Sequence, residues 1–329
     1  MTWARRPRDD APAPRHLSTT RLDLVRLDEL GHRPRRAASR LQESPIVRGS
    51  RSGASRLLLL LSSVISACSA AQSTGPAQDP ESQSIAEYDI ARDLWLNRGQ
   101  PREALDHVLK AVDLDDDNAD AAHLAALLYL DFCRQGVEAC RLAEAERHAR
   151  AALELKADFR EARNTLGVTL IHEQRYADAI AVLLPLTEDM LYRTPENAWG
   201  NIGWAYLEQG SLPQAVSALQ RSVAAQPDFC VGHYRLGLAE ERLGNHEQAL
   251  DSFTRALSAA GGRCQGLQEA YAGRARLLTA MNRSGEAQGD LQTCVRLDKR
   301  TDAGRECLAL LEPTQSAPVE GQREPQAAP

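Results

Sequence analysis

Apolar and small residues recur three and four positions apart over most of this chain, and that spacing predicts helices. Between residues 85 and 312 the helical segments come in pairs, separated by short breaks that often contain glycine or proline. The arrangement returns after about 34 residues, which is the mark of an internal repeat. The pattern therefore predicts an all-α chain built as one array of helix pairs.

The clearest repeat runs from Glu196 to Phe229. We expect small residues to let the two helices approach closely, glycine to end the first helix, and proline to end the second. The residues that mark this repeat are Trp199, Ile202, Gly203, Tyr206, Gly210, Ala215, Leu219, Ser222 and Pro227. Their spacing resembles that of the tetratricopeptide repeat, with Ser222 where alanine is usual.

Further repeats flank this one and fill the rest of the array. The resemblance implies an all-α tetratricopeptide-repeat (TPR) superhelical solenoid of about six repeats plus a C-terminal cap helix, in which each repeat packs on its neighbours. The other repeats cover Ile85–Asn118, Ala119–Phe159 with about seven inserted residues near Cys133–Cys140, a segment from Arg160 that is about four residues long in excess, Cys230–Arg263, and a segment from about Gln268, before a cap at Ala303–Glu312.

Charge is distributed unevenly along the chain. Residues 1–67 contain 13 Arg, no Lys and 6 acidic residues, a local charge of +7, whereas residues 68–329 carry −13. The overall value of −6 describes neither part. The lack of a basic excess in the repeats argues against a nucleic-acid-binding protein. The sharp change indicates a targeting or processing segment at the boundary.

The boundary has the pattern of a secretory signal. Three arginines precede the mostly apolar residues 57–67, and Cys68 follows. This stretch is too short to remain as a bilayer-spanning anchor, which needs about 20 apolar residues. The ending Ile65-Ser66-Ala67-Cys68 resembles the lipobox of bacterial lipoproteins, which implies cleavage before Cys68 and its acylation. Ser69, rather than Asp, implies the outer membrane. A cleaved soluble export signal and an apolar core helix with a stray cysteine are the alternatives.

Five segments follow from these patterns. We expect a leader at 1–46 that is disordered or a start-site artefact, because Val47 would give a signal of ordinary length with three arginines. A signal peptide at 47–67 is followed by a lipidated Cys68 and flexible tether at 68–84, the solenoid at 85–312, and a disordered tail at 313–329.

Six cysteines remain after Cys68, an even number that suggests disulfides in an exported protein. Fifteen pairings are possible, and nearest-neighbour topology favours one of them. A zinc site is the competing interpretation, but the sequence has no CxxC and no histidine at ligand spacing to a cysteine pair. The favoured pairs are Cys133 with Cys140, Cys230 with Cys264, and Cys294 with Cys307.

The sequence gives little sign of catalysis, and we expect no enzyme activity and no cofactor. Residues 262–266 formally match a nucleophile elbow with Cys264 in place of serine, but that motif needs a preceding strand. Asp113 and residues 115–117 superficially resemble a calcium loop, yet the required glycine and closing glutamate are missing. Metal binding is therefore not expected either.

What such a solenoid does is bind proteins, and the first helix of each pair lines its concave face. Residues three to four apart on these helices predict an apolar groove with polar margins, suited to an amphipathic helix or an extended apolar segment. The alternative is that these side chains pack between adjacent helices as core. The expected groove residues are Leu127, Leu130, Asn164, Val168, Ile171, Trp204, Leu207, Tyr234, Leu238 and Arg242, with His123 at the margin.

A lipobox, a short tether and six tetratricopeptide repeats resemble the pilotins of type IV pili, the Tgl/PilF/PilW-like lipoproteins. The resemblance covers Cys68 to about Glu312. It implies an outer-membrane lipoprotein, facing the periplasm, that binds secretin subunits and promotes their localisation and multimerisation for pilus biogenesis and gliding or twitching motility. The partners implied are a secretin and, through acylated Cys68, the membrane, with no nucleic acid or small-molecule substrate. The alternative is a lipoprotein scaffold for another envelope or cell-wall assembly machine.

Overall fold

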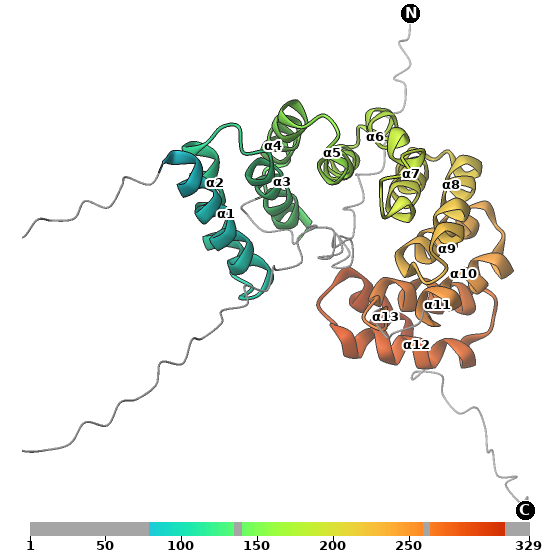
Figure 1. The fold of residues 1–329 in the computed structure, drawn as a ribbon. Helices are drawn as coiled ribbons and strands as arrows, with labels where there is room; N and C mark the ends of the chain where they lie inside the picture. The colour runs from blue at the N-terminus through green and yellow to red at the C-terminus, as the bar shows by residue number, and fades with distance from the viewer. Residues whose placement is uncertain (1–78, 135–139, 259–263, 313–329) are drawn as a thin grey trace, which may run out of the picture.

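The computed structural model describes residues 79–134, 140–258 and 264–312, and within them it contains α-helices and one short 3-10 helix (Figure 1). Its elements are α1 (Pro80–Leu96), α2 (Pro101–Leu114), α3 (Ala119–Arg134), α4 (Leu142–Leu155), α5 (Arg160–His172), α6 (Tyr176–Leu183), η2 (Leu184–Thr187), α7 (Pro195–Gln209), α8 (Leu212–Ala225), α9 (Cys230–Leu243), α10 (His246–Ser258), α11 (Gln268–Ala280), α12 (Ser284–Leu297) and α13 (Asp302–Leu311).

Consecutive helices pair as antiparallel hairpins, and the pairs stack into a curved solenoid. Figure 1 shows α3, α5, α7 and α9 along the inner side of the arch, with α4, α6, α8 and α10 outside them. We call the first helix of each pair its A helix and the second its B helix. Six pairs and α13 confirm the expected all-α solenoid of six repeats plus a cap.

The solenoid begins earlier than the sequence predicted. The Asp79 carboxylate accepts a hydrogen bond from the Ser82 N–H at 2.8 Å, and Pro80 occupies the first turn of α1. An acidic cap followed by proline is a strong helix start. The tether assigned to 68–84 is therefore too long at its C-terminal end, because α1 already includes residues from Pro80 onward.

Close contact between the two helices of a repeat depends on glycine at one position of the A helix. A Cβ atom at Gly203 would lie 2.5 Å from Leu219 Cγ, and one at Gly237 would lie 2.8 Å from the Phe253 ring. These distances are far below van der Waals contact, so only glycine permits the observed packing. The small residues of the repeat thus have the role that the sequence suggested for them.

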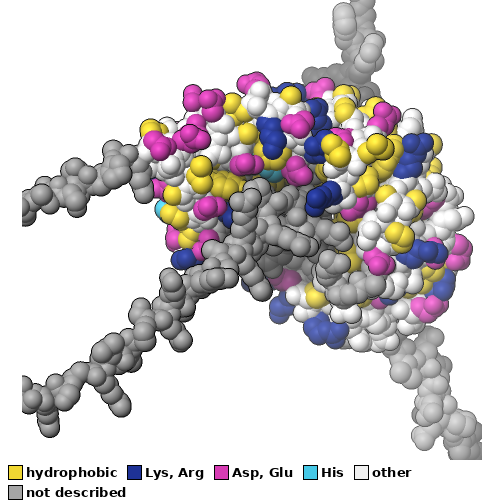
Figure 2. All heavy atoms as spheres, viewed as in Figure 1, with side chains coloured by type: hydrophobic (Ala, Val, Ile, Leu, Met, Phe, Trp, Pro, Cys, Tyr) yellow, Lys and Arg dark blue, Asp and Glu magenta, His cyan; other side chains and the backbone are white. Residues whose placement is uncertain are grey.

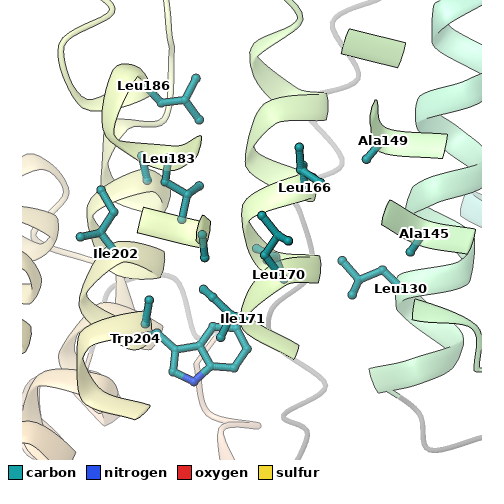
Figure 3. Packing of buried hydrophobic residues seen from close by; sticks show 14 of the residues in the cluster. Leu130, Ala145, Ala149, Leu166, Leu170, Ile171, Leu183, Leu186, Ile202 and Trp204 are labelled. Atoms are coloured by element: carbon teal, nitrogen blue, oxygen red, sulfur yellow. The ribbon is translucent and has the colours of Figure 1, made fainter. Parts of the chain in front are cut away.

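Apolar packing runs through the array as a series of clusters. In the largest cluster, Leu166 and Leu170 of α5 lie between α3 and α4 on one side and α6 and α7 on the other (Figure 3). Each interface is closed mainly by leucine and alanine, as expected for a chain with only 5% aromatic residues. Stability is therefore distributed over neighbouring repeats, as in other solenoids.

The described part of the chain contains three disulfides, and they are the three pairs that the sequence favoured. Cys133–Cys140 closes a loop within the second repeat, and Cys230–Cys264 joins the starts of the fifth and sixth repeats. Cys294–Cys307 joins α12 to the cap helix α13. The leader, the signal, Cys68 and the C-terminal tail lie outside the described residues. None of the described helices is both long and apolar enough to span a bilayer.

Candidate functional site: a pocket on the concave face

A pocket that opens to solvent lies on the inner side of the array. Its walls come from five successive A helices, because the curvature of the solenoid brings α1 and α9 to the same hollow. Such concave sites at the junction of several elements are common places for ligand binding. The lining residues are Trp95, Leu127, Leu130, Asp131, Arg134, Asn164, Thr165, Val168, Asn197, Asn201, Phe229, Val231 and Arg235.

A row of polar side chains crosses the pocket from one repeat to the next. The Arg235 guanidinium donates to Asn201 Oδ1 at 3.1 Å, and the Asn201 amide donates to Asn164 Oδ1 at 3.0 Å. The three residues sit on α9, α7 and α5 and are all buried. Because buried polar side chains are costly unless they are paired, this row holds the three A helices in register and fixes the polar surface of the pocket.

The same helices supply the apolar part of the wall. Leu127 and Leu130 come from α3 and Val168 from α5, while Trp95 and Val231 belong to the first and fifth repeats. An ion pair between Asp131 and Arg134, 3.7 Å apart, lies beside them. The pocket is consequently amphipathic, with side chains that can contact both apolar groups and the main-chain N–H and C=O groups of a bound segment.

Four of the ten expected groove residues line this pocket, namely Leu127, Leu130, Asn164 and Val168. The apolar groove predicted from the sequence is wrong in detail, because a row of amides replaces much of the expected aliphatic surface. Of the remaining six, Tyr234 and Leu238 are half-buried beside Phe253 or its neighbours, and Arg242 donates to the Leu207 carbonyl oxygen.

The other three expected residues, Ile171, Trp204 and Leu207, belong to the interior. Ile171 has no exposed surface and Leu207 has 1%, so the core alternative is correct for both. Trp204 is 9% exposed, with the Arg235 guanidinium 4.4 Å from its ring centroid and the His172 ring against its edge. The Trp204 ring therefore packs against the Arg235 guanidinium and does not form the surface of the groove.

His123, expected at the margin, is also buried. Its Nε2 lies 3.0 Å from Thr165 Oγ1, and its ring packs on Phe159. Burial lowers the pKa of His123 to about 3, so the ring is neutral at physiological pH. The histidine is thus a structural link between α3 and α5 behind the pocket wall.

Among the described residues, the two motifs with a formal resemblance to functional sites have structural roles. Cys264, the centre of the formal nucleophile motif, is bonded to Cys230 and so has no thiol. Asp115, Asp116 and Asp117 lie close together in the turn between α2 and α3, where the Asp117 N–H donates to the Asp115 carboxylate. That contact is typical of a helix-ending turn.

Comparison with known proteins agrees with this architecture. The tetratricopeptide repeat model matches residues 137–186 and 201–263. No curated protein matches this chain.

Three solved structures share the fold over most of the described array. PilW, a widely conserved type IV pilus biogenesis factor, is similar with a TM-score of 0.57 and 22% identity, covering 68% of this chain and 98% of PilW. PilF of Pseudomonas aeruginosa gives 0.54 and 18%, covering 70% and 98%. A tetratricopeptide repeat protein of Parabacteroides merdae gives 0.56 and 14%, covering 70% and 84%.

The fold is therefore an all-α tetratricopeptide-repeat solenoid. Solenoids of this kind are in general protein-interaction scaffolds rather than enzymes. Two of the similar structures are type IV pilus proteins, and at these sequence identities the likeness establishes the fold that they share with this chain.

Proposed function

We propose that this protein is a pilotin-like lipoprotein of the outer membrane. In this proposal the chain is acylated at Cys68 and holds secretin subunits for multimerisation during type IV pilus biogenesis and surface motility. The observation that carries the proposal is the concave pocket, which five successive repeats build in a chain whose sequence has a lipobox and a short tether before the array. The likeness to PilW and PilF over nearly their whole length supports it.

The chemistry of the pocket favours an extended segment of the partner. Asn164 and Asn201 offer amides in a row along the array, and amides match the donors and acceptors of a peptide main chain. The flanking leucines and Trp95 provide apolar contacts for side chains of the same segment. A secretin subunit waiting to form a ring has unpaired strands, and covering one of them prevents premature association.

The acyl anchor contributes to partner binding by confining the protein to the membrane. Confining the solenoid to a membrane surface raises its effective concentration for another protein that inserts there, without any added contact. Several acyl chains would make this hold durable, since a single chain binds only marginally. Cys68→Ala is therefore expected to release the protein from the membrane fraction and to reduce secretin assembly.

The decisive experiment compares heat-stable secretin multimers in cells that lack the gene and in cells that carry pocket variants. We expect Asn201→Ala to reduce multimer formation, because it interrupts the amide row. The matched control is Asn245→Ala, which removes an amide bonded to Glu240 outside the pocket and is expected to leave multimers normal.

Normal multimers in the deletion strain would overturn the proposal. Altered cell shape with normal pili would instead indicate a scaffold for another envelope or cell-wall assembly machine. Circular dichroism of both asparagine variants separates loss of binding from loss of folding.

A further inference from the structure

The connection between α6 and α7 exposes two large apolar side chains to water. Met190 is 97% exposed and Leu191 is 73% exposed, whereas the other exposed large apolar side chains of the described residues lie between 39% and 51%. We call Met190 and Leu191 the apolar tip. Two such neighbours held fully in water mark an interaction site more strongly than scattered surface leucines do.

The apolar tip is an addition to the repeat. Gly167 and Gly203 face Leu183 and Leu219 from the same place in the third and fourth repeats and are 36 positions apart, whereas Gly203 and Gly237 are 34 apart. The extra residues fall between α6 and α7, where η2 and the loop after it replace the usual short turn. None of the residues that line the pocket belongs to this connection, so the added residues lie outside the pocket.

Contacts on both sides of the tip fix its conformation. Leu186 and Tyr192 are buried in the main core cluster and anchor the loop before and after the tip. Between them, the Asp189 carboxylate accepts from the Leu191 N–H at 2.8 Å and from Arg160 Nε at 2.6 Å. These donors lower the pKa of Asp189, the Leu191 N–H first and Arg160 second, so the bracing carboxylate stays ionised near neutral pH.

We infer that the apolar tip dips into the lipid surface to which the chain is anchored and sets the orientation of the solenoid on it. The inference rests on the proposed acylation of Cys68. From Cys68 to Asp79 there are eleven steps along the chain, which span at most about 40 Å, so the array stays close to its anchor. The start of α1 and the α6–α7 connection lie on the same, upper, side of the solenoid in Figure 1.

The surroundings of the tip fit an uncharged contact. Hydrophobic side chains gather over α6 and the start of α7 on the face shown in Figure 2. Exposed Leu184 and Pro185 of η2 precede the tip in sequence, and nearby Glu188 and Arg193 have opposite charges. The net charge of −13 on residues 68–329 opposes attraction to anionic headgroups, so the contact depends on apolar insertion and is insensitive to salt.

The test uses the acylated full-length protein, purified from membranes and reconstituted into phosphatidylethanolamine–phosphatidylglycerol vesicles. Met190→Cys supplies the labelling site, because the six cysteines of the described residues form disulfides. A polarity-sensitive fluorophore at position 190 is expected to shift to the blue and to be quenched by nitroxide-labelled lipid. The same fluorophore at Gln248→Cys, an exposed site on α10, is expected to remain in water.

A second variant tests the insertion energetically. Adding Leu191→Ser to the labelled protein is expected to lower the inserted fraction on the order of tenfold, because one buried leucine side chain is lost. The blue shift should survive high salt. Both positions are exposed, so these variants are expected to fold, and circular dichroism verifies that they do.

Each contrary result has its own meaning. A label at position 190 that stays in water on an acylated protein overturns this inference while the proposed pilotin role stands. A shift that appears only after a partner protein is added also overturns it and assigns the tip to that protein. If mass spectrometry finds no acyl group on Cys68, the proposed anchor fails and this inference fails with it.

Discussion

The first four repeats and the last two are stabilised in different ways. Among the described residues, the disulfide of α1–α8 closes a loop inside one repeat, whereas the two disulfides of α9–α13 join successive units. Arg276 of α11 also binds Glu241 of α9 and Glu306 of α13, so one side chain links three helices. The early repeats depend instead on the largest apolar cluster and on the amide row.

The difference matters because most of the residues that line the pocket lie in the first four repeats. Helices that are held by packing and hydrogen bonds can shift slightly when a segment binds, whereas a covalent link between repeats restricts such movement. The C-terminal repeats thus form a cross-linked base, and the pocket belongs to the part that keeps freedom to adjust.

Removing the disulfide between the fifth and sixth repeats should have the largest effect. Loop-closure entropy predicts that Cys230→Ser with Cys264→Ser lowers the free energy of unfolding by about 4 kcal/mol, since the bond spans 34 positions. The control pair, Cys133→Ser with Cys140→Ser, closes only 7 positions and should cost about 2.5 kcal/mol. Calorimetry of the oxidised proteins measures both values, and equal losses would contradict a special role for the link between repeats.

Packing in the early repeats should be nearly as sensitive to one added side chain. Gly203→Val places a branched side chain against Leu219 and is expected to cost about 3 kcal/mol, as overpacking commonly does. The control is Gly289→Ala in α12, where an added Cβ meets nothing and helix propensity improves by about 1 kcal/mol. Thermal unfolding followed by circular dichroism should therefore move in opposite directions for the two variants.

The glycine positions and the cysteine pairs are parts of the fold that could be predicted from the sequence. A glycine or small residue at a fixed place in every repeat specifies close helix packing, so Gly203 and Gly237 identified the helix pairs. Cys230 and Cys264 were pairable because both lie near the starts of neighbouring repeats. In both cases the sequence of two neighbouring repeats was sufficient for the prediction, since each repeat contacts only its neighbours.

The residues that line the pocket could be predicted less well from the sequence, for two physical reasons. An inner helix such as α7 is enclosed by helices on several sides, so buried residues run almost continuously from Ala198 to Leu207 and no periodic face is left to mark the groove. In addition, curvature of the whole array brings Trp95 of α1 and Val231 of α9 to one hollow. Helical periodicity contains no information on that curvature. Asn201 and Arg235 are separated by 34 positions, the length of one repeat, and this spacing was the one signal in the sequence that they lie side by side.

Acid should destabilise the early repeats more than the late ones. Burial lowers the pKa of His123 to about 3, and burial with the neighbouring Arg147 lowers that of His148 to about 4. The unfolded chain binds protons at these sites below about pH 6.5 while the folded chain does not, so stability is complete above that pH and is lost as the pH falls.

The test compares unfolding at pH 6.5 and pH 5. Each such histidine should contribute a loss of about 1.4 kcal/mol per pH unit in this window, so about 2 kcal/mol over the whole step. In His123→Gln the pH dependence should be smaller by that amount. His246→Gln, which replaces an exposed ring on α10, serves as the matched control variant. An unaltered dependence in His123→Gln would show that the ring is not neutral in the folded protein.

The smallest expected effect concerns the turns between the helices of a repeat. Gly210 and Gly244 end their A helices in the left-handed region, both at φ 81°, but Gln174 has the equivalent place in the third repeat at φ 63°. A residue other than glycine in this left-handed conformation destabilises the folded protein by about 1–2 kcal/mol. Replacing it with glycine recovers only part of this energy, because glycine also gives the unfolded chain more conformational freedom. Gln174→Gly should therefore stabilise by about 0.5–1 kcal/mol, and Gly210→Gln, whose Cβ would meet nothing, should destabilise by a similar amount. Opposite shifts in melting temperature would show that backbone conformation alone limits the early repeats at this turn, whereas destabilisation by Gln174→Gly would mean that the glutamine side chain makes a compensating contact.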